Sequence, residues 1–361
     1  MLVEIIVIGL RNKTKAAAGA LSLTIIGISL LLTTCGGKSG NAALPPTTPT
    51  VFSAYDLTGA ITPVRDPSVM RQGSTYYVFG TDVAGVNGSL PIMCSTDRVA
   101  WISCGYVFRQ MPTWVKAQVP GIIGLWAPDI SYFNGLYHIY YAGSTFGSNI
   151  SVIGLATNTT LDQTDPNYQW VDQGEVLGSV SSDDFNAIDP TILADTDGRV
   201  WLTCGSYWSG IKQRQIDPTT GLLLASNPTV YSLAFRPNVQ YDPIEGTSLV
   251  HKGSYYYLFA SFDNCCAADP YQDTYRIMVG RGTSPQGPFT DMNGIDMMQG
   301  GGTQLLAGNG VTWNGPGGET AYLDAENGDI IVFHAIQLPE GTAYLFVNSL
   351  TWPNDWPQIE P

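Results

Sequence analysis

Short runs of aromatic and β-branched residues recur along the chain, and each follows a turn that contains glycine. Runs of this kind, bounded by turn residues, predict strands, and no helical stretch separates them. The runs cover residues 76–79, 137–141, 200–202, 255–259 and 330–333, after turns at Gly73, Gly135, Gly198, Gly253 and Gly328. The pattern therefore predicts an all-β protein.

This pattern of strands and turns repeats with a nearly constant period. Aligned on Val69, Ile130, Ile192, Leu249 and Tyr322, successive copies lie 61, 62, 57 and 73 residues apart. A period of this length is typical of four-stranded blades stacked around an axis. We therefore predict a five-bladed β-propeller over residues 51–361.

Three of the five copies open on an acidic residue. These are Asp66 in Arg-Asp-Pro-Ser-Val, Asp189 in Asn-Ala-Ile-Asp-Pro and Glu245 in Pro-Ile-Glu-Gly-Thr. In a propeller the same strand of every blade lines the central channel, so we expect the three side chains to point toward one place. Each acid alone is equally well explained as an ordinary turn residue, but the shared position favours a functional site.

Composition and charge narrow the class of ligand. The chain has 40 Gly, 23 Pro and 19 Tyr, which suits many tight turns and half-buried strands. It carries 30 acidic against 16 basic residues, a formal charge of −14, and no cluster of Lys and Arg follows Lys15. Nucleic acid is therefore not an expected partner, whereas a neutral ligand or a positively charged transition state fits.

The N-terminus predicts export. Arg11, Lys13 and Lys15 precede an uncharged run over residues 16–34, and the run ends at Cys35, as in a bacterial lipoprotein signal. Simple secretion and an uncleaved anchor are the alternatives, since the run is just long enough to span a bilayer. We predict a signal over residues 1–35, a flexible linker over residues 36–50 and the propeller domain from residue 51.

Five cysteines follow Cys35. Cys94 and Cys104 flank a short turn and are placed to bridge two strands of one hairpin. The adjacent Cys265 and Cys266 form either a vicinal disulfide or two separate thiols, and Cys204 is expected to be a buried thiol. No His accompanies a cysteine at metal-ligand spacing, so we do not expect a zinc site.

Three acids at one place suit the cleavage of an acetal. One carboxylic acid protonates the leaving oxygen, a carboxylate opposite it activates water, and a third tunes the pKa of the acid. A serine nucleophile has little support, because the chain has no Gly-x-Ser-x-Gly and only three His. Phosphate-loop and dinucleotide fingerprints are also absent from the sequence.

Aromatic residues beside small residues suggest sugar-binding surfaces. Trp126, Phe146 and Trp208 each stand near a predicted strand end among Ala, Ser or Gly. For any one of them, packing within a blade is the simpler explanation. Trp208 is the clearest exception, because Ser and Gly stand around it where a packing strand would carry bulky residues.

Taken together, these motifs resemble those of the arabinanases of glycoside hydrolase family 43. The resemblance runs in order from about Asp56 to the C-terminus and includes Arg-Asp-Pro-Ser-Val, Trp-Ala-Pro-Asp-Ile, Ser-Thr-Phe-Gly-Ser-Asn, Phe-Asn-Ala-Ile-Asp-Pro, Gly-Ser-Tyr-Trp-Ser-Gly-Ile and Phe-Asp-Asn-Cys-Cys. It implies a five-bladed propeller and inverting, single-displacement hydrolysis of α-1,5-linked L-arabinofuranose, with internal cleavage of the chain expected.

The resemblance also implies roles for individual residues. Asp66 would be the general base, Glu245 the general acid and Asp189 the residue that tunes and orients the acid. Substrate contacts would come from Trp126, Phe146, Asn186 and Trp208. His334 would face a largely water-coordinated calcium ion in the channel, although a lone strand His is by itself more often structural. Arg276 would either reach the acids or form a salt bridge on the blade surface.

The chain departs from the family pattern at three places. It has Arg65 where relatives commonly have His before the base, Gly246-Thr247 where they have Ala-Pro after the acid, and Gly318 where they have a His after Gly-Pro-Gly. The alternatives are therefore an exo-acting α-L-arabinofuranosidase or β-xylosidase, a non-catalytic glycan-binding propeller and a purely structural propeller. No apolar strip stands out, so a monomer is expected.

Overall fold

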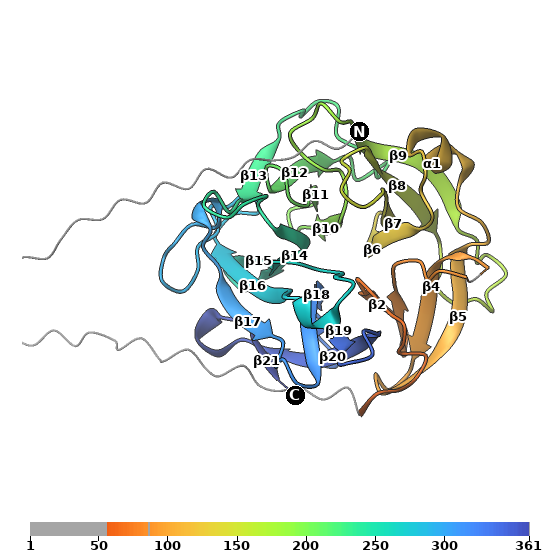
Figure 1. Cartoon of the computed structure of the whole chain (residues 1–361). Helices are drawn as coiled ribbons and strands as arrows, with labels where there is room; N and C mark the ends of the chain where they lie inside the picture. The colour runs from red at the N-terminus through yellow and green to blue at the C-terminus, as the bar shows by residue number, and fades with distance from the viewer. Residues whose placement is uncertain (1–55, 86, 361) are drawn as a thin grey trace, which may run out of the picture. The chain divides into compact units, whose positions relative to one another are not determined.

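Five β-sheets surround one axis in the computed structural model, which describes residues 56–85 and 87–360 (Figure 1). The first sheet has five strands, ordered β1-β5-β4-β3-β2, and each of the others has four. The prediction of an all-β, five-bladed propeller is thus confirmed. The signal and linker predicted over residues 1–50, with Cys35, lie outside the described residues.

Each blade is built from consecutive strands. Their bounds are β1 Thr58–Gly59, β2 Ser68–Gln72, β3 Thr75–Phe79, β4 Ser89–Ser95 and β5 Ala100–Phe108 in blade 1; β6 Leu125–Phe133, β7 Leu136–Gly143, β8 Ser151–Asn158 and β9 Val171–Ser179 in blade 2; β10 Thr191–Ala194, β11 Val200–Cys204, β12 Ile211–Ile216 and β13 Tyr231–Ala234 in blade 3; β14 Ile244–Lys252, β15 Tyr255–Phe262, β16 Arg276–Gly282 and β17 Thr303–Ala307 in blade 4; and β18 Trp313–Tyr322, β19 Ile330–Gln337, β20 Ala343–Thr351 and β21 Gln358–Glu360 in blade 5.

The aromatic runs that predicted strands form β3, β7, β11, β15 and β19. Counted outward from the axis, each is the second strand of its blade. Helical structure is small in the described part of the chain. It comprises α1 (Thr113–Gln118) and the short 3-10 turns η2 (Pro270–Gln272), η3 (Met297–Gln299) and η4 (Pro353–Asp355). Helix α1 was not expected from the sequence, and it lies in the connection between blades 1 and 2. No helix among the described residues is both long and apolar enough to cross a membrane.

One edge strand of each sheet lies nearest the axis. In blade 1 this is β2, because β1 pairs at the outer edge. Strands β2, β6, β10, β14 and β18 contact one another in turn, and β18 contacts β2, so the ring closes (Figure 1). Each blade therefore presents the start of its innermost strand to the central channel.

A left-handed residue precedes the pairing of the innermost strand in blades 1 and 3 and interrupts it in blades 2, 4 and 5. These channel-turn residues are Asp66, Ala127, Asp189, Gly246 and Gly318, with φ of 47°, 40°, 54°, 57° and 58°. Only glycine adopts this conformation without strain, and Asp is one of the residues that tolerates it best. Five equivalent sharp turns thus direct the chain around the axis.

The channel turns correct the phase of the repeat inferred from sequence. Asp66 and Asp189 are themselves channel-turn residues, but Glu245 precedes the turn at Gly246 by one position. In blade 5 the turn is at Gly318, so Ala321 rather than Tyr322 is equivalent to Val69, and Glu319 follows the turn directly. The three predicted acids share a neighbourhood, not one repeat position.

A side chain of the preceding blade accepts the backbone N–H of four channel-turn residues. Thr81 Oγ1 accepts from Ala127 (2.9 Å), Asp189 Oδ2 from Gly246 (3.0 Å), Ser261 Oγ from Gly318 (2.9 Å) and His334 Nδ1 from Asp66 (3.1 Å). Thr81, Ser261 and His334 stand at one repeat position, two residues beyond the partners of Ser68, Ser248 and Thr320 in the second strand.

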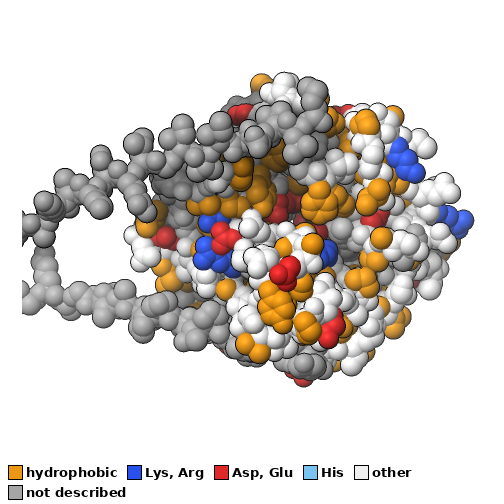
Figure 2. Space-filling view, viewed as in Figure 1, with side chains coloured by type: hydrophobic (Ala, Val, Ile, Leu, Met, Phe, Trp, Pro, Cys, Tyr) orange, Lys and Arg blue, Asp and Glu red, His pale blue; other side chains and the backbone are white. Residues whose placement is uncertain are grey.

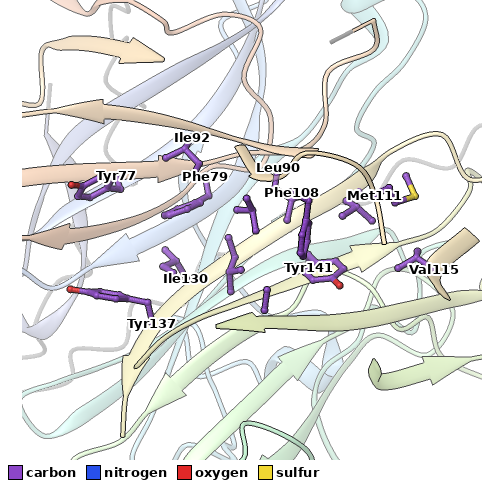
Figure 3. Close-up of a cluster of buried hydrophobic side chains, with 14 of the residues drawn as sticks. Tyr77, Phe79, Leu90, Ile92, Phe108, Met111, Val115, Ile130, Tyr137 and Tyr141 are labelled. Atoms are coloured by element: carbon purple, nitrogen blue, oxygen red, sulfur yellow. The ribbon is translucent and has the colours of Figure 1, made fainter. Parts of the chain in front are cut away.

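Buried apolar side chains fill each space between adjacent blades. Figure 3 shows the cluster between blades 1 and 2, where Phe79 and Leu90 meet Tyr141 and Ile130. Similar clusters lie between the other neighbouring pairs, including blades 5 and 1. Burial at the blade interfaces is therefore the main stabilising contribution to the ring.

The expected bridge between Cys94 and Cys104 is present, and of the two alternatives for Cys265 and Cys266 the structure shows the disulfide. Cys94 and Cys104 link β4 to β5 within blade 1, and Cys265 and Cys266 form a vicinal disulfide. Cys204 is a buried free thiol in β11, as expected.

Candidate active site

A large cleft crosses the face of the propeller on which the channel turns open. Its volume is about 1670 Å³, larger than the pockets that hold most single small ligands. The lining comes from blades 1 to 4 and from the loops around α1 and includes Asp66, Asp189 and Glu245. In the space-filling view, acidic side chains lie in a hollow near the middle of this face, with hydrophobic side chains around it (Figure 2).

Asp66 is fixed by the last and the first blade together. Its backbone N–H donates to His334 Nδ1, and its Oδ2 accepts a hydrogen bond from Thr81 Oγ1 at 2.6 Å. The side chain is 26% exposed, so solvent and ligand reach it. The carboxylate therefore has a defined orientation in the cleft.

Glu245 stands at the start of β14 and is half-buried. Ser206 Oγ donates to its Oε2 at 2.5 Å and the Tyr275 hydroxyl to its Oε1 at 2.9 Å. Burial raises the pKa of Glu245 and the negative charge of Asp66 raises it further, whereas the two hydrogen bonds lower it. The net effect is upward, which favours the protonated acid.

Asp189 supports Glu245 from the neighbouring blade. Its Oδ2 accepts the backbone N–H of Gly246, the residue after Glu245. Burial raises the pKa of Asp189 well above its ordinary value, and the charges of Glu245 and Asp66 add to this. Two neighbouring carboxyl groups resist double ionisation, so the charge of Glu245 favours the protonated form of Asp189.

Four of the five predicted substrate residues line the cleft. They are Trp126, Phe146, Asn186 and Trp208. The rings of Trp126 and Phe146 lie 5.1 Å apart, and Phe146 is 80% exposed. Trp208 follows Tyr207 in a turn where both have positive φ, and this turn exposes 39% of Trp208. Exposed rings of this kind offer flat apolar surfaces to a sugar.

Arg276 does not line the cleft. Its Nε pairs with Asp263 Oδ2 at 2.8 Å, and its guanidinium also donates to Gln304 Oε1. Asp263 pairs with Arg236 as well, so Arg276 is held in a network of charged residues in blade 4. The contact with the acids is therefore not present, and the alternative prediction of a salt bridge describes Arg276.

Sequence reasoning missed several residues of the cleft. Thr81, Ser206 and Tyr275 hydrogen-bond to the acids, and Tyr241 is an exposed ring in the lining. The Gly-Ser-Tyr-Trp motif indicates a sugar-binding surface through its rings, and nothing in it indicates a role for Ser206. Thr81 follows β3 and Tyr275 precedes β16. The residues next to them in the sequence form no motif that indicates a functional role.

The vicinal disulfide forms part of the cleft wall. Cys265 and Cys266 both line the cleft, and Arg65 Nη1 lies 3.3 Å from Cys266 Sγ. Arg65, which differs from the family pattern, is thus held against the disulfide beside Asp66. The chain's departure at this position changes the wall and leaves the acids in place.

His334 uses one ring nitrogen to hold the backbone, and its other ring nitrogen, Nε2, is buried without a hydrogen-bond partner among the described residues. A backbone amide is always a donor, so Nδ1 holds a lone pair toward Asp66 and the neutral ring carries its hydrogen on Nε2. Burial lowers the pKa of His334 to about 4, which keeps the ring neutral. A protonated Nε2 has no lone pair for direct coordination of a cation, but it can donate a hydrogen bond to a water molecule bound to one. The contact supports the structural alternative for this His.

Oxygen atoms near the channel fit a hard cation better. A small cavity beneath the acids is lined by Glu319 and Thr247, and Glu319 Oε1 and Thr247 Oγ1 are buried without a hydrogen-bond partner. Calcium prefers carboxylate, hydroxyl and water oxygens. Among the described residues, no three His, Cys, Asp or Glu side chains converge on one point, so water would have to complete such a shell.

The arrangement brings a hydrogen-bonded, accessible carboxylate and a carboxyl group of raised pKa into one cleft with exposed aromatic rings. Such a pair supports general acid–base cleavage of a glycosidic bond. The cleft also extends beyond one sugar unit, so it suits a chain.

Comparisons with known proteins agree with this chemistry. Residues 61–357 match the family described as glycosyl hydrolases family 43. An extracellular endo-α-(1→5)-L-arabinanase from Bacillus subtilis is 40% identical over 296 residues, which cover 81% of this chain and 87% of the relative. An extracellular exo-α-(1→5)-L-arabinofuranosidase from Cellvibrio japonicus is 38% identical, covering 82% of this chain and 86% of the relative.

A solved structure shows the same similarity in three dimensions. The family 43 endo-arabinanase from Bacillus licheniformis superposes with a TM-score of 0.75 at 42% sequence identity, and the match covers 84% of this chain and 99% of that one. Fold, sequence and the family match agree over the whole propeller. This chain belongs to the glycosyl hydrolases of family 43.

Proposed function

We propose that the protein hydrolyses internal α-1,5-linkages of L-arabinofuranose chains in arabinan by inverting, single-displacement hydrolysis. The observation that carries this proposal is the meeting of Asp66, Asp189 and Glu245 in one long cleft. The 40% identical relative that is named an endo-arabinanase supports the choice of substrate and of internal cleavage.

In this mechanism Asp66 is the base. It takes a proton from a water molecule while the water oxygen forms a bond to the anomeric carbon. Glu245 gives its proton to the leaving oxygen as the glycosidic C–O bond breaks. One displacement without a covalent intermediate inverts the anomeric configuration, so the first product is the β-anomer.

Asp189 would act through Glu245. Its hydrogen bond to the Gly246 N–H would hold the backbone beside the acid, and because the two neighbouring carboxyl groups resist ionising together, the pair would retain a proton for the reaction. Trp126, Phe146 and Trp208 would pack against sugar faces, and Asn186 would contact the chain near the acids. Asn186 itself is oriented by Ser151 Oγ, which donates to its Oδ1 at 2.7 Å.

Calcium stays part of the proposal, with Glu319 and Thr247 in place of His334 as the protein residues beside it. A bound cation there would offset the negative charge gathered beneath the cleft. Chelator-treated protein titrated with calcium in a calorimeter tests this idea. Binding that Glu319→Gln abolishes and His334→Gln retains would support the oxygen site, and the reverse pattern would restore the imidazole ligand.

A second candidate is exo-acting hydrolysis on the same fold. The 38% identical relative named an exo-α-(1→5)-L-arabinofuranosidase favours its inclusion. An exo-enzyme releases one small product from the start of the reaction, whereas an endo-enzyme releases a range of chain lengths. Activity on xylan instead would indicate a β-xylosidase, and binding without turnover a glycan-binding propeller.

Export is also proposed. The basic residues, apolar run and Cys35 resemble a lipoprotein signal, and both relatives named above are described as extracellular. Metabolic labelling with a radioactive fatty acid in a bacterial host tests lipidation, and Cys35→Ala should remove the label. We further propose a monomer, which light scattering of the purified protein tests.

The stereochemistry of the product tests the mechanism directly. Proton NMR during hydrolysis of linear arabinan should show β-anomeric signals first, with α-anomers appearing as the sugar equilibrates. Asp66→Ala and Glu245→Gln should reduce kcat by roughly 10³-fold or more, because each removes one side of the displacement. Early α-anomer, or full activity in either variant, would contradict the mechanism.

A further inference from the structure

We propose that Thr81 is a positioning residue that orients the carboxylate of Asp66 for catalysis. The inference rests on the proposed function, because it takes Asp66 as the general base. Thr81 follows β3 in blade 1 and lines the cleft beside Asp66. It contacts no catalytic group other than this carboxylate in the described part of the chain.

The two hydrogen bonds of Thr81 determine where its proton points. The backbone N–H of Ala127 donates to Thr81 Oγ1 at 2.9 Å, and an amide is only ever a donor. The hydroxyl has one hydrogen, which is directed to Asp66 Oδ2 at 2.6 Å. The N–H of the neighbouring blade thus fixes the direction of the hydroxyl.

This direction distinguishes the two oxygens of Asp66. Oδ2 accepts the Thr81 hydroxyl, so one of its two lone pairs is already engaged. Oδ1 receives no hydrogen bond from any described residue, and the neutral ring of His334 lies beside it, with Nδ1 at 3.5 Å. The proton taken from water is therefore delivered to Oδ1.

His334 completes the support from the opposite side. Its Nδ1 accepts the N–H of Asp66, which holds the left-handed backbone (φ 47°) at this residue. Blade 5 thus fixes the main chain and blade 1 fixes the carboxylate. A base held at both points keeps its lone pair aligned with the attacking water, and such alignment is a large part of catalysis.

The other blades show that the capping role alone does not require this contact. Ser261 occupies the same repeat position as Thr81 and also accepts a channel-turn N–H, but it donates to Glu319 Oε2 at 2.7 Å. Only in blade 1 is the proton of the capping hydroxyl directed to the proposed base. The contact of Thr81 with Asp66 is therefore specific to the site.

The test compares Thr81→Val with Thr81→Ser on soluble arabinan. Valine keeps the shape but lacks the hydroxyl, so kcat should fall roughly 10- to 100-fold while KM stays within about twofold. Serine restores the hydroxyl, so kcat should return to within about threefold of the parent. Thr62→Val is the matched control, because it removes a hydroxyl that donates to Ala343 O outside the cleft lining.

Three outcomes would overturn the inference: an unchanged kcat in Thr81→Val, a rise in KM without a change in kcat, or a loss in Thr81→Ser equal to that in Thr81→Val. Thr81→Ala gives the same comparison if the valine variant does not fold. Asp66→Ala separates the two levels. If Asp66→Ala is inactive while Thr81→Val keeps full kcat, only the proposed role of Thr81 is wrong. If Asp66→Ala is active, the assignment of Asp66 as the base is wrong as well.

Discussion

Glu245 receives hydrogen bonds from two hydroxyl groups although its proposed task is to give a proton away. The bonds from Ser206 and Tyr275 lower the pKa of Glu245, while burial and Asp66 raise it. This balance places the pKa above that of an ordinary Glu yet keeps the proton transferable. We therefore expect the two hydroxyls to tune the proposed acid and to set the upper pH limit of activity.

Removing the Tyr275 hydroxyl should move that limit. Tyr275→Phe takes away a hydrogen bond that lowers the pKa of Glu245, so the pKa rises and the acid stays protonated to higher pH. We expect the basic limb of the kcat profile to shift upward by roughly 0.5–1 pH unit. Tyr271→Phe is the control, because Tyr271 is an exposed ring outside the cleft lining. A downward shift would contradict the assignment of Glu245 as the acid.

At the scale of elements, side-chain oxygens of the innermost strands tie neighbouring blades together. Ser68 Oγ accepts the N–H of Ile130, Asp129 Oδ2 that of Ile192 and Ser248 Oγ that of Ala321. The buried carboxyl group of Asp129 thus accepts a backbone N–H of the next blade, as the hydroxyl groups of the two serines do. It has a structural role in the ring.

The stability of the ring should therefore depend on the protonation of Asp129. Burial raises its pKa to about 7, so the folded protein keeps a proton that the unfolded chain releases above about pH 4. The free energy of unfolding consequently falls as pH rises from about 4 to about 7 and levels off above that. Asp129→Asn removes this dependence, on the order of 1–4 kcal/mol. Thermal unfolding of both proteins from pH 4.5 to 7.5 measures it, and parallel curves would contradict the prediction.

The repeat of the elements was predictable from sequence, but its phase was not fully so. Runs of aromatic and β-branched residues after glycine turns mark the strand next to the innermost one in each blade. The left-handed channel turns were not marked, since Asp, Ala and Gly all occupy them. For that reason the sequence pattern puts Glu245 in register with Asp66. It also does not show that Glu319 directly follows a channel turn.

The site was predictable only where side chains line the cleft. The three acids and four of the five proposed substrate residues line the cleft, as the motifs predicted. Thr81, Tyr275 and the Nδ1 contact of His334 depend on which atoms face each other across blades. No spacing along the chain shows this, so the support of the acids could be found only in the structure.

For the molecule as a whole, the ring closes between the last and the first blade. Residues 61–64 bond to β20 through Ile61 O, which accepts from Leu345 N, and through Val64 N, which donates to Ala343 O. In addition, Asp324 of blade 5 accepts from the Tyr76 hydroxyl at 2.5 Å and pairs with Arg71 Nε at 3.2 Å. Non-covalent contacts close the ring, and within residues 56–85 and 87–360 each sheet is built from the strands of one blade.

The Asp324 contacts predict a loss of stability in acid. Burial raises the pKa of Asp324, but hydrogen bonds from Tyr76 and Asn327 outweigh it and lower the pKa to about 2. The contribution of ionised Asp324 to the free energy of unfolding is present above about pH 4 and is lost as pH falls toward 2. Asp324→Asn should lower the unfolding midpoint at pH 7 by roughly 2–6 °C and differ less from the parent near pH 2.5. An equal difference at both pH values would contradict it.

The product profile from linear α-1,5-arabinan tests the central claim most directly. Purified protein and its Glu245→Gln variant are incubated with the polymer, and the released sugars are separated by chain length at early times. We predict a ladder of arabino-oligosaccharides from the parent and none from the variant. Release of a single small product from the start would contradict internal cleavage, and the same products from both proteins would contradict the role of Glu245.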